Sequence, residues 1–134
     1  MHSAFEVRTR TRTALVSITR EVREAVSALG VENGAVVVYC PHTTAAITIN
    51  ENADPDVARD IDVKLSEMVP CSGDYRHCEG NSDSHVKSSL VGCSETLLVS
   101  DGELALGTWQ GIFFCEFDGP RSRHVYVKLV SDPQ

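Results

Sequence analysis

Short apolar runs, separated by turn residues, constrain the fold of this 134-residue chain most strongly. Apolar runs such as Ala35–Tyr39 and Gly111–Cys115 have only five residues each. A membrane-spanning helix needs roughly 20. Runs this short, rich in β-branched and aromatic residues, are typical of strands. Because 134 residues is also the usual size of one compact domain, the pattern predicts a single soluble domain over residues 1–134.

Strands and helices are expected to follow one another in mixed order. The expected strands cover residues 4–12, 35–40, 45–50, 95–100, 103–106, 109–117 and 124–130. Three helices are expected from their start and end signals. The first begins at Thr19 and ends at Gly30, the second begins at Asp54-Pro55 and ends at Pro70, and the third begins at Ser82 or Asp83 and ends at Gly92. Asp101-Gly102 is the turn dipeptide of a tight hairpin. A chain of many strands with about three inserted helices is typical of an α+β fold with a largely antiparallel sheet.

The net charge limits the class of partner. A formal charge of −7 repels the phosphate backbone of nucleic acids. The one basic cluster, Arg8, Arg10 and Arg12, alternates with threonines and is expected on one face of a solvated edge strand. The sequence therefore predicts a protein that binds neither nucleic acid nor membrane.

Cysteine usage and the N-terminus indicate the cytoplasm. The five cysteines are odd in number and form no C-x-x-C pair, so no disulfide framework is expected. Cys40, Cys93 and Cys115 are expected as small buried hydrophobes, while a bond between Cys71 and Cys78 is a minor alternative. The N-terminus also lacks the basic segment and apolar core of a secretory signal.

Three histidines stand at expected junctions between elements. His42 follows a strand, His77 lies in a polar loop, and His85 falls in the first turn of the third helix. Three neutral imidazoles leave a tetrahedral metal ion one open position for water or substrate. Because no two of them are spaced as a motif pair, ordinary surface histidines are the alternative.

The segment from Glu79 to Lys87 suits an anion. Unpaired amides at a helix start attract phosphate, and Gly80 permits close approach of the backbone. Ser82, Ser84 and Lys87 offer further donors, whereas Glu79 and Asp83 could orient histidine rings. An ordinary capped helix is the alternative.

The segment 109–123, which contains the expected strand over residues 109–117, carries two acids, Glu116 and Asp118, on one face beside Arg121 and Arg123. Such a carboxylate can act in acid/base chemistry, and surface ion pairs are the alternative. Before this strand, Trp109 could stack on an aromatic substrate and Gln110 could read its edge, although such a tryptophan is more often core or interface. His2 and His124 are assigned no role.

Four motifs in this order resemble the YjbQ-like family, whose members are described as secondary thiamine-phosphate synthases. The motifs are Pro41–Ala45 with Asn50–Asn52, Tyr75–His77, His85–Ser89 and Gly107–Gly111. The resemblance spans essentially the whole chain. It departs from the family over Phe117–Arg123, which leaves open which arginine meets the substrate.

The resemblance implies a homotrimer of α+β subunits with a metal and anion pocket. Three nitrogen ligands favour a divalent ion such as zinc, with manganese or cobalt as the alternatives. It implies that a hydroxymethylpyrimidine diphosphate is joined to a thiazole phosphate with release of pyrophosphate. The expected catalytic residues are His42, His77, His85 and Glu116, the three histidines being the metal ligands. The expected substrate or anion contacts are Thr43, Thr44, Asn50, Glu51, Asn81, Ser82, Lys87, Ser88, Trp109, Gln110 and Arg121. A metal-dependent hydrolase of a small phosphorylated or ester substrate and a non-enzymatic metal or anion sensor are the alternatives.

Overall fold

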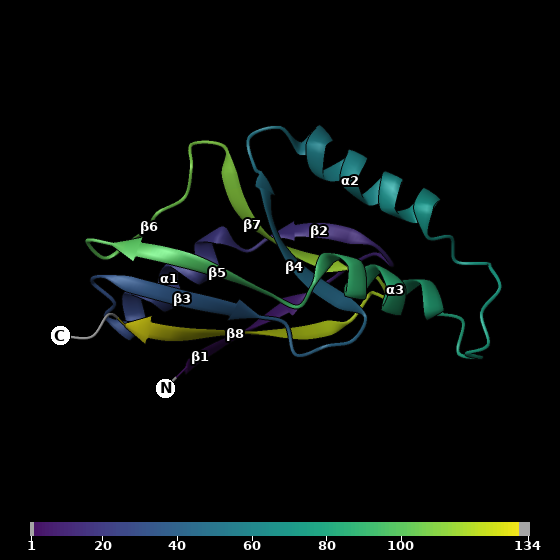
Figure 1. Cartoon of the computed structure of the whole chain (residues 1–134), viewed down its shortest axis with the longest axis horizontal. Coiled ribbons are helices and arrows are strands. Elements are labelled where there is room, and N and C mark those ends of the chain that lie inside the picture. The colour runs from purple at the N-terminus through teal and green to yellow at the C-terminus, as the bar shows by residue number, and fades with distance from the viewer. Residues whose placement is uncertain (1, 132–134) are drawn as a thin grey trace.

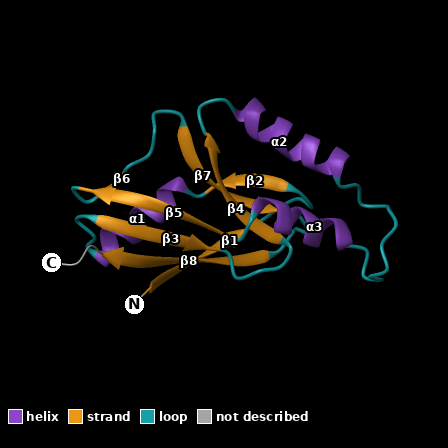
Figure 2. Ribbon diagram, in the orientation of Figure 1, coloured by secondary structure: helices purple, strands orange, loops and turns teal. Residues whose placement is uncertain are grey.

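The computed structural model describes residues 2–131, which form two antiparallel sheets and three helices (Figures 1 and 2). In chain order the elements are β1 (His2–Arg8), β2 (Ala14–Ser17), α1 (Thr19–Leu29), β3 (Gly34–Tyr39), β4 (Ala45–Glu51), α2 (Pro55–Met68), α3 (Ser82–Val91), β5 (Ser94–Ser100), β6 (Glu103–Leu104), β7 (Gln110–Glu116) and β8 (Ser122–Ser131). This confirms the predicted α+β class. Within these residues no helix is long and apolar enough to cross a membrane.

The strands form a five-stranded sheet in the order β1-β8-β3-β5-β6 and a three-stranded sheet in the order β2-β7-β4. In the larger sheet Val38 of β3 lies between Val127 of β8 and Glu95 of β5. The tight hairpin at Asp101-Gly102 is confirmed, because both residues have positive φ and Ser100 pairs with Glu103. All of the paired strands run antiparallel, as predicted.

The main core joins both sheets and α1. Strand alternation turns Val36 and Val38 inward, and the apolar stripe of α1 adds Val22 and Val26. A smaller cluster of Ala46, Cys115 and Phe117 lies on the other face of the three-stranded sheet, against partly buried residues of α2 and α3. His42, His77 and His85 therefore lie at the rim of a well-packed scaffold.

Two predicted helix caps are wrong, and one is confirmed. Thr19 lies inside α1, where its Oγ1 accepts a hydrogen bond from the Ile112 amide at 2.9 Å. Ser82 and Asp83 lie inside α3, and the residue before the helix, Asn81, makes no side-chain cap. By contrast, Asp54 caps α2 by accepting from the Asp56 amide at 2.9 Å. The side chains that the sequence pattern assigned to caps instead contact residues that are distant in the sequence.

The first strand is shorter than predicted. β1 ends at Arg8, because Thr9 is buried and exchanges hydrogen bonds with Arg121. Arg12 then leaves the sheet and pairs with both carboxylate oxygens of Asp83 at 3.0 Å. The prediction of a solvated strand face that includes Arg12 is therefore wrong.

All five cysteines are free. Cys40 and Cys115 are buried as predicted, and burial raises the pKa of their thiols to about 11 and about 12. Cys93 is exposed, contrary to prediction, because it stands in the turn between α3 and β5. The alternative Cys71–Cys78 disulfide is not formed.

A buried ion pair ties the two sheets together. Arg123 of β8 donates from Nε to Glu116 Oε1 of β7 at 2.8 Å, and its Nη2 donates to Glu116 Oε2 and to Thr44 Oγ1. Thr9 Oγ1 and the Asp118 amide also donate to this carboxylate, at 2.7 and 3.0 Å. Burial raises the pKa of Glu116, but these hydrogen bonds outweigh it, so the pKa lies below its ordinary value. The group is an ionised, fully partnered carboxylate.

We expect Glu116→Gln to lower the free energy of unfolding by about 3–5 kcal/mol, because it leaves the Arg123 charge buried without its partner. The matched control is Glu6→Gln, which removes a carboxylate from an exposed pair with Arg8 and should leave stability almost unchanged. Urea denaturation measures the free energy of unfolding of both variants. Equal losses in the two variants would contradict the role assigned to the buried pair.

Candidate functional site

A polar pocket of about 370 Å³ forms where the β3–β4 loop, the start of α3 and the β7–β8 loop meet. We call it the histidine pocket, and its lining is Pro41, His42, Thr43, Thr44, Glu79, Asn81, His85, Asp118, Arg121 and Arg123. A neighbouring hollow shares His42, Thr43 and His85 with it and extends to Ser88 and Cys93. Segments about 80 positions apart thus supply one site (Figure 1).

His42 enters the pocket as a neutral hydrogen-bond donor. Its Nε2 accepts a hydrogen bond from the His124 backbone amide at 2.9 Å, so the proton of the neutral ring is on Nδ1. Burial lowers the pKa of His42, and the positive charge of Arg123 lowers it further. Sequence reasoning assigned His124 no role, and because every non-proline residue carries such an amide, no signal could have revealed it.

His77 and His85 contact each other beside the pocket. Their ring centroids are 5.4 Å apart and the rings are almost perpendicular. Ser82 Oγ lies 2.9 Å from His77 Nδ1, and Glu79 lies 3.8 Å from His77 Nε2. The structure thus brings His85 together with His42 and with His77, but not all three around one point.

The predicted three-histidine metal site is not assembled within one chain. Among residues 2–131 no group of three or more His, Cys, Asp or Glu side chains is placed to hold a metal ion. The His42 Nε2 lone pair, which a metal would need, already accepts the His124 amide. The residues as arranged do not fit this metal site, so the zinc ion stays a prediction.

The pocket offers two features that favour an anion. The N-cap residue of α3, Asn81, makes no side-chain cap, and Asn81 and His85 from this helix start line the pocket. Arg121 is half-exposed and is oriented by Asp118, to which it donates at 2.7 and 2.9 Å. Arg123 is instead engaged by Glu116 and Thr44. Of the two arginines left open by the sequence, Arg121 is the accessible one.

Asn81 adds an unused acceptor to the pocket. Its Nδ2 donates to Asp118 Oδ2 at 2.8 Å, whereas its Oδ1 is buried and has no hydrogen-bond partner. A buried acceptor without a partner costs free energy, which a donor from a ligand would recover.

Lys87, a predicted substrate contact, does not line the histidine pocket. Lys87 is buried and donates to Ser66 at 3.1 Å, with Asp83 at 3.6 Å, so it lies under α2 and not in the histidine pocket. Burial raises the pKa of Asp83, but Arg12 and Lys87 outweigh it and lower the pKa overall. The Arg12–Asp83 pair spans 71 positions, a separation that no local pattern reveals.

The predicted contacts Asn50, Glu51, Trp109 and Gln110 lie at the other end of the three-stranded sheet. Ala45 pairs with Glu116 near the histidine pocket, whereas Glu51 pairs with Gln110. The six steps between these pairs span about 20 Å. Trp109 is 63% exposed there. In one chain these residues do not join the histidine pocket.

Comparison with known proteins decides the family. The family model described as UPF0047 protein YjbQ-like matches residues 3–132. The chain is 55% identical over 128 residues to UPF0047 protein MJ1081 from Methanocaldococcus jannaschii, covering 96% of this chain and 93% of that protein. The chain belongs to the UPF0047 (YjbQ-like) family.

Other UPF0047 proteins agree in sequence and fold. YugU from Bacillus subtilis is 50% identical, with 97% of this chain and 99% of YugU covered. The crystal structure of a YjbQ/UPF0047-family protein from Clostridium acetobutylicum has 53% identity and a TM-score of 0.93, covering 96% of this chain and 99% of that one. The resemblance stated from the four motifs is therefore confirmed.

In this UPF0047 protein we expect His42 to titrate below its ordinary pKa of 6.5. As the pH falls, the unfolded chain then takes up the proton first. The stability linked to His42 is therefore present above pH 6.5 and is lost as the pH drops towards the folded pKa. Histidine-resolved NMR titration measures this value, and a His42 pKa at or above 6.5 would contradict the burial of the ring beside the charge of Arg123.

Proposed function

We propose that this UPF0047 protein is a transferase with thiamine-phosphate-synthase-like activity. It joins a hydroxymethylpyrimidine diphosphate to a thiazole phosphate and releases pyrophosphate. The observation that carries the proposal is that His42, His85 and Arg121 line one pocket beside the uncapped start of α3. These groups are hydrogen-bond donors of the kind that a diphosphate needs.

In the proposed transfer reaction the site must stabilise a leaving group. The thiazole nitrogen forms a bond to the methylene carbon of the pyrimidine substrate, and the bond between this carbon and the diphosphate oxygen breaks. The electron pair of the broken bond goes to pyrophosphate, where negative charge develops. Donors that are already oriented towards this charge lower the barrier. Arg121, fixed by Asp118, supplies a charge-assisted donor, and His42 supplies its Nδ1–H.

His85 and Glu116, the other predicted catalytic residues described here, have different roles beside these donors. We infer that His85, which lines the same pocket from the first turn of α3, donates to the same phosphate. Glu116 is a positioning residue, because all of its contacts serve Arg123, Thr9 and the Asp118 amide. Among residues 2–131 no three-ligand metal site is present, so the residue roles proposed above do not involve the metal ion.

We further propose that the enzyme works as a homotrimer in the cytoplasm. In support, Trp109 is largely exposed and lies about 20 Å along the sheet from the histidine pocket. A neighbouring subunit is needed if Trp109 and Gln110 are to contact the same substrate as His85. Five free cysteines fit a reducing compartment.

We expect Arg121→Ala and His85→Ala each to reduce kcat/KM for pyrophosphate release by about 100-fold, the usual cost of removing one preoriented donor. Both side chains reach solvent, so folding should be retained. Arg20→Ala is the matched control, because this α1 arginine is 83% exposed and lies outside the pocket.

A coupled pyrophosphate assay with both substrates, and with each alone, separates the candidate functions. Release that requires both substrates supports the transferase. Phosphate release from one substrate alone would indicate a hydrolase, and saturable binding without turnover would indicate a sensor. Either of these results would overturn the proposed function.

A further inference from the structure

Two cysteines lie opposite each other where the paired strands β3 and β5 meet the histidine pocket. Tyr39 at the end of β3 pairs with Ser94 at the start of β5, so the next step of the antiparallel register places Cys40 opposite Cys93. The Cys40 amide donates to the Cys93 carbonyl oxygen at 2.7 Å, which extends the pairing by this step. The Cα atoms of two residues opposed in this way are about 5.5 Å apart.

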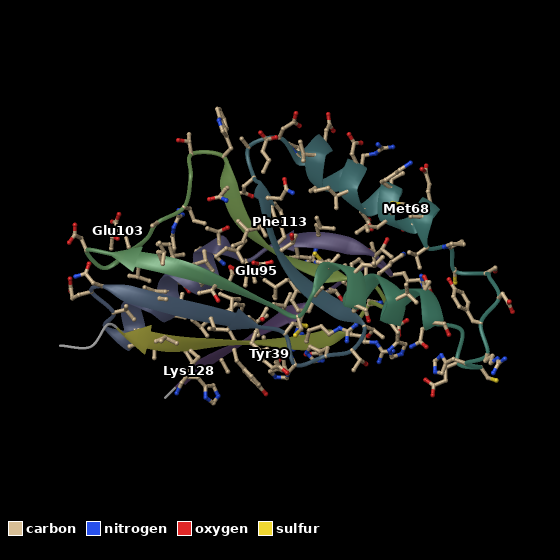
Figure 3. All side chains as sticks on the ribbon, in the orientation of Figure 1. Tyr39, Met68, Glu95, Glu103, Phe113 and Lys128 are labelled. Carbon is tan, nitrogen blue, oxygen red and sulfur yellow. The ribbon has the colours of Figure 1, made fainter. Side chains whose placement is uncertain are left out.

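Both cysteine side chains belong to the same face of the sheet. Side chains alternate along a strand, and Tyr39 and Glu95 point to opposite sides (Figure 3). Cys40 is one position after Tyr39 and Cys93 is two positions before Glu95, so both lie on the Glu95 side. Burial is the main cause that raises the pKa of Cys40, and the Cys93 thiol is close enough to raise it as well. A disulfide needs Cα atoms about 4.4–6.8 Å apart, a range that includes this pair.

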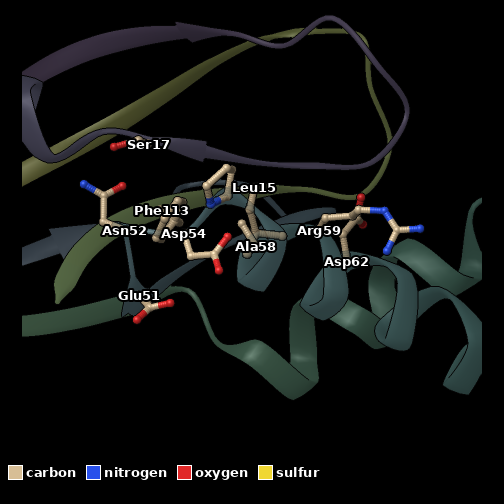
Figure 4. Close-up of a pocket in the computed structure, with 10 residues that line it drawn as sticks. Leu15, Ser17, Glu51, Asn52, Asp54, Ala58, Arg59, Asp62 and Phe113 are labelled. Carbon is tan, nitrogen blue, oxygen red and sulfur yellow. The ribbon is translucent and has the colours of Figure 1, made fainter.

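The two thiols differ in their access to solvent. Cys40 is 1% exposed, whereas Cys93 is exposed and lines the hollow of about 530 Å³ beside the histidine pocket. By contrast, none of the ten described residues that line the cavity between α2 and the three-stranded sheet is a cysteine (Figure 4). A reagent in solution therefore reaches Cys93 first, and Cys40 reacts only through Cys93.

We propose that Cys40 and Cys93 form a reversible disulfide when the protein meets a peroxide. The Cys93 thiol loses its proton to water and attacks an oxygen of hydrogen peroxide. A sulfur–oxygen bond forms, the oxygen–oxygen bond breaks, and the released hydroxide takes up a proton and leaves as water. The Cys40 sulfur then attacks the Cys93 sulfur. The sulfur–sulfur bond forms, the sulfur–oxygen bond breaks, and a second water leaves with the Cys40 proton. The two sulfurs lose two electrons in all, which reduce the peroxide.

The spacing of the pair makes this bond a switch and not a permanent crosslink. Opposed Cβ atoms in a sheet are about 4.5–5.5 Å apart, whereas a disulfide needs about 3.5–4.5 Å. Closing the bond therefore draws the two strand ends together, and the resulting strain favours reduction by cellular thiols. In a reducing compartment the dithiol is the resting form, and the disulfide forms only during exposure to peroxide.

The disulfide is placed to change the histidine pocket. His42 is two positions after Cys40, and its ring is held by the His124 amide. Drawing Cys40 towards β5 displaces this segment, so the His42 donor no longer points at a bound phosphate. Cys93 also shares its hollow with His85. The formation of the bond is independent of the proposed function, whereas its effect on turnover rests on that function.

The first test treats the unmodified protein with hydrogen peroxide and maps its peptides by mass spectrometry without reduction. The protein should lose two hydrogen atoms in mass, one crosslink should join Cys40 to Cys93, and dithiothreitol should restore the original mass. The NMR signals of the His42 ring should shift in the oxidised form. Oxygen added to Cys93 without a crosslink, a disulfide that joins two chains, or unchanged His42 signals in the crosslinked protein would overturn the proposal.

The second test compares two cysteine variants. Cys93→Ser should abolish the loss of hydrogen, whereas Cys78→Ser is the matched control, since it removes another exposed thiol and should leave the crosslink intact. Peroxide should lower the rate of pyrophosphate release by about 10- to 100-fold in the unmodified protein and in Cys78→Ser, because a displaced donor loses its alignment. The rate of Cys93→Ser should not change on treatment. An equal rate before and after crosslinking would overturn the switch, whereas an inactive reduced protein would refute only the proposed function.

Discussion

The ion pair between Glu116 and Arg123 is the interaction on which the rest of the structure depends. It crosses from the three-stranded sheet to the five-stranded sheet, and it is shielded from water. Arg123 also binds Thr44, two positions after His42, and the backbone amide next to Arg123 fixes the His42 ring. Glu116 fixes the amide of Asp118, which in turn orients Arg121. One buried pair therefore sets the geometry of the histidine pocket.

The separation of the predicted site residues follows from the length and direction of β4 and β7. At one end of this strand pair, loops and the start of α3 form the histidine pocket. At the other end Glu51 pairs with Gln110, about 20 Å away. One chain alone therefore does not bring both groups of residues to one point.

Local sequence signals predicted the elements well, because strand alternation, the Asp54 cap and the Asp101-Gly102 turn depend on neighbouring residues alone. They failed where side chains are used across the fold. Arg12 binds Asp83, Thr9 binds Glu116, and His42 binds a backbone amide 82 positions away. Each of these contacts uses a side chain in a way that local residue type and spacing do not predict. Residue type and spacing named candidates for the site, but only the packing of distant segments determined their roles.

The central claim is that the histidine pocket binds the phosphate-bearing part of a substrate. Isothermal titration calorimetry with pyrophosphate tests it most directly, because pyrophosphate is the proposed leaving group and needs no second substrate. We expect saturable binding to the unmodified protein that is strongly weakened by Arg121→Ala and unaffected by Arg20→Ala. Absence of binding, or equal affinity in all three proteins, would contradict it.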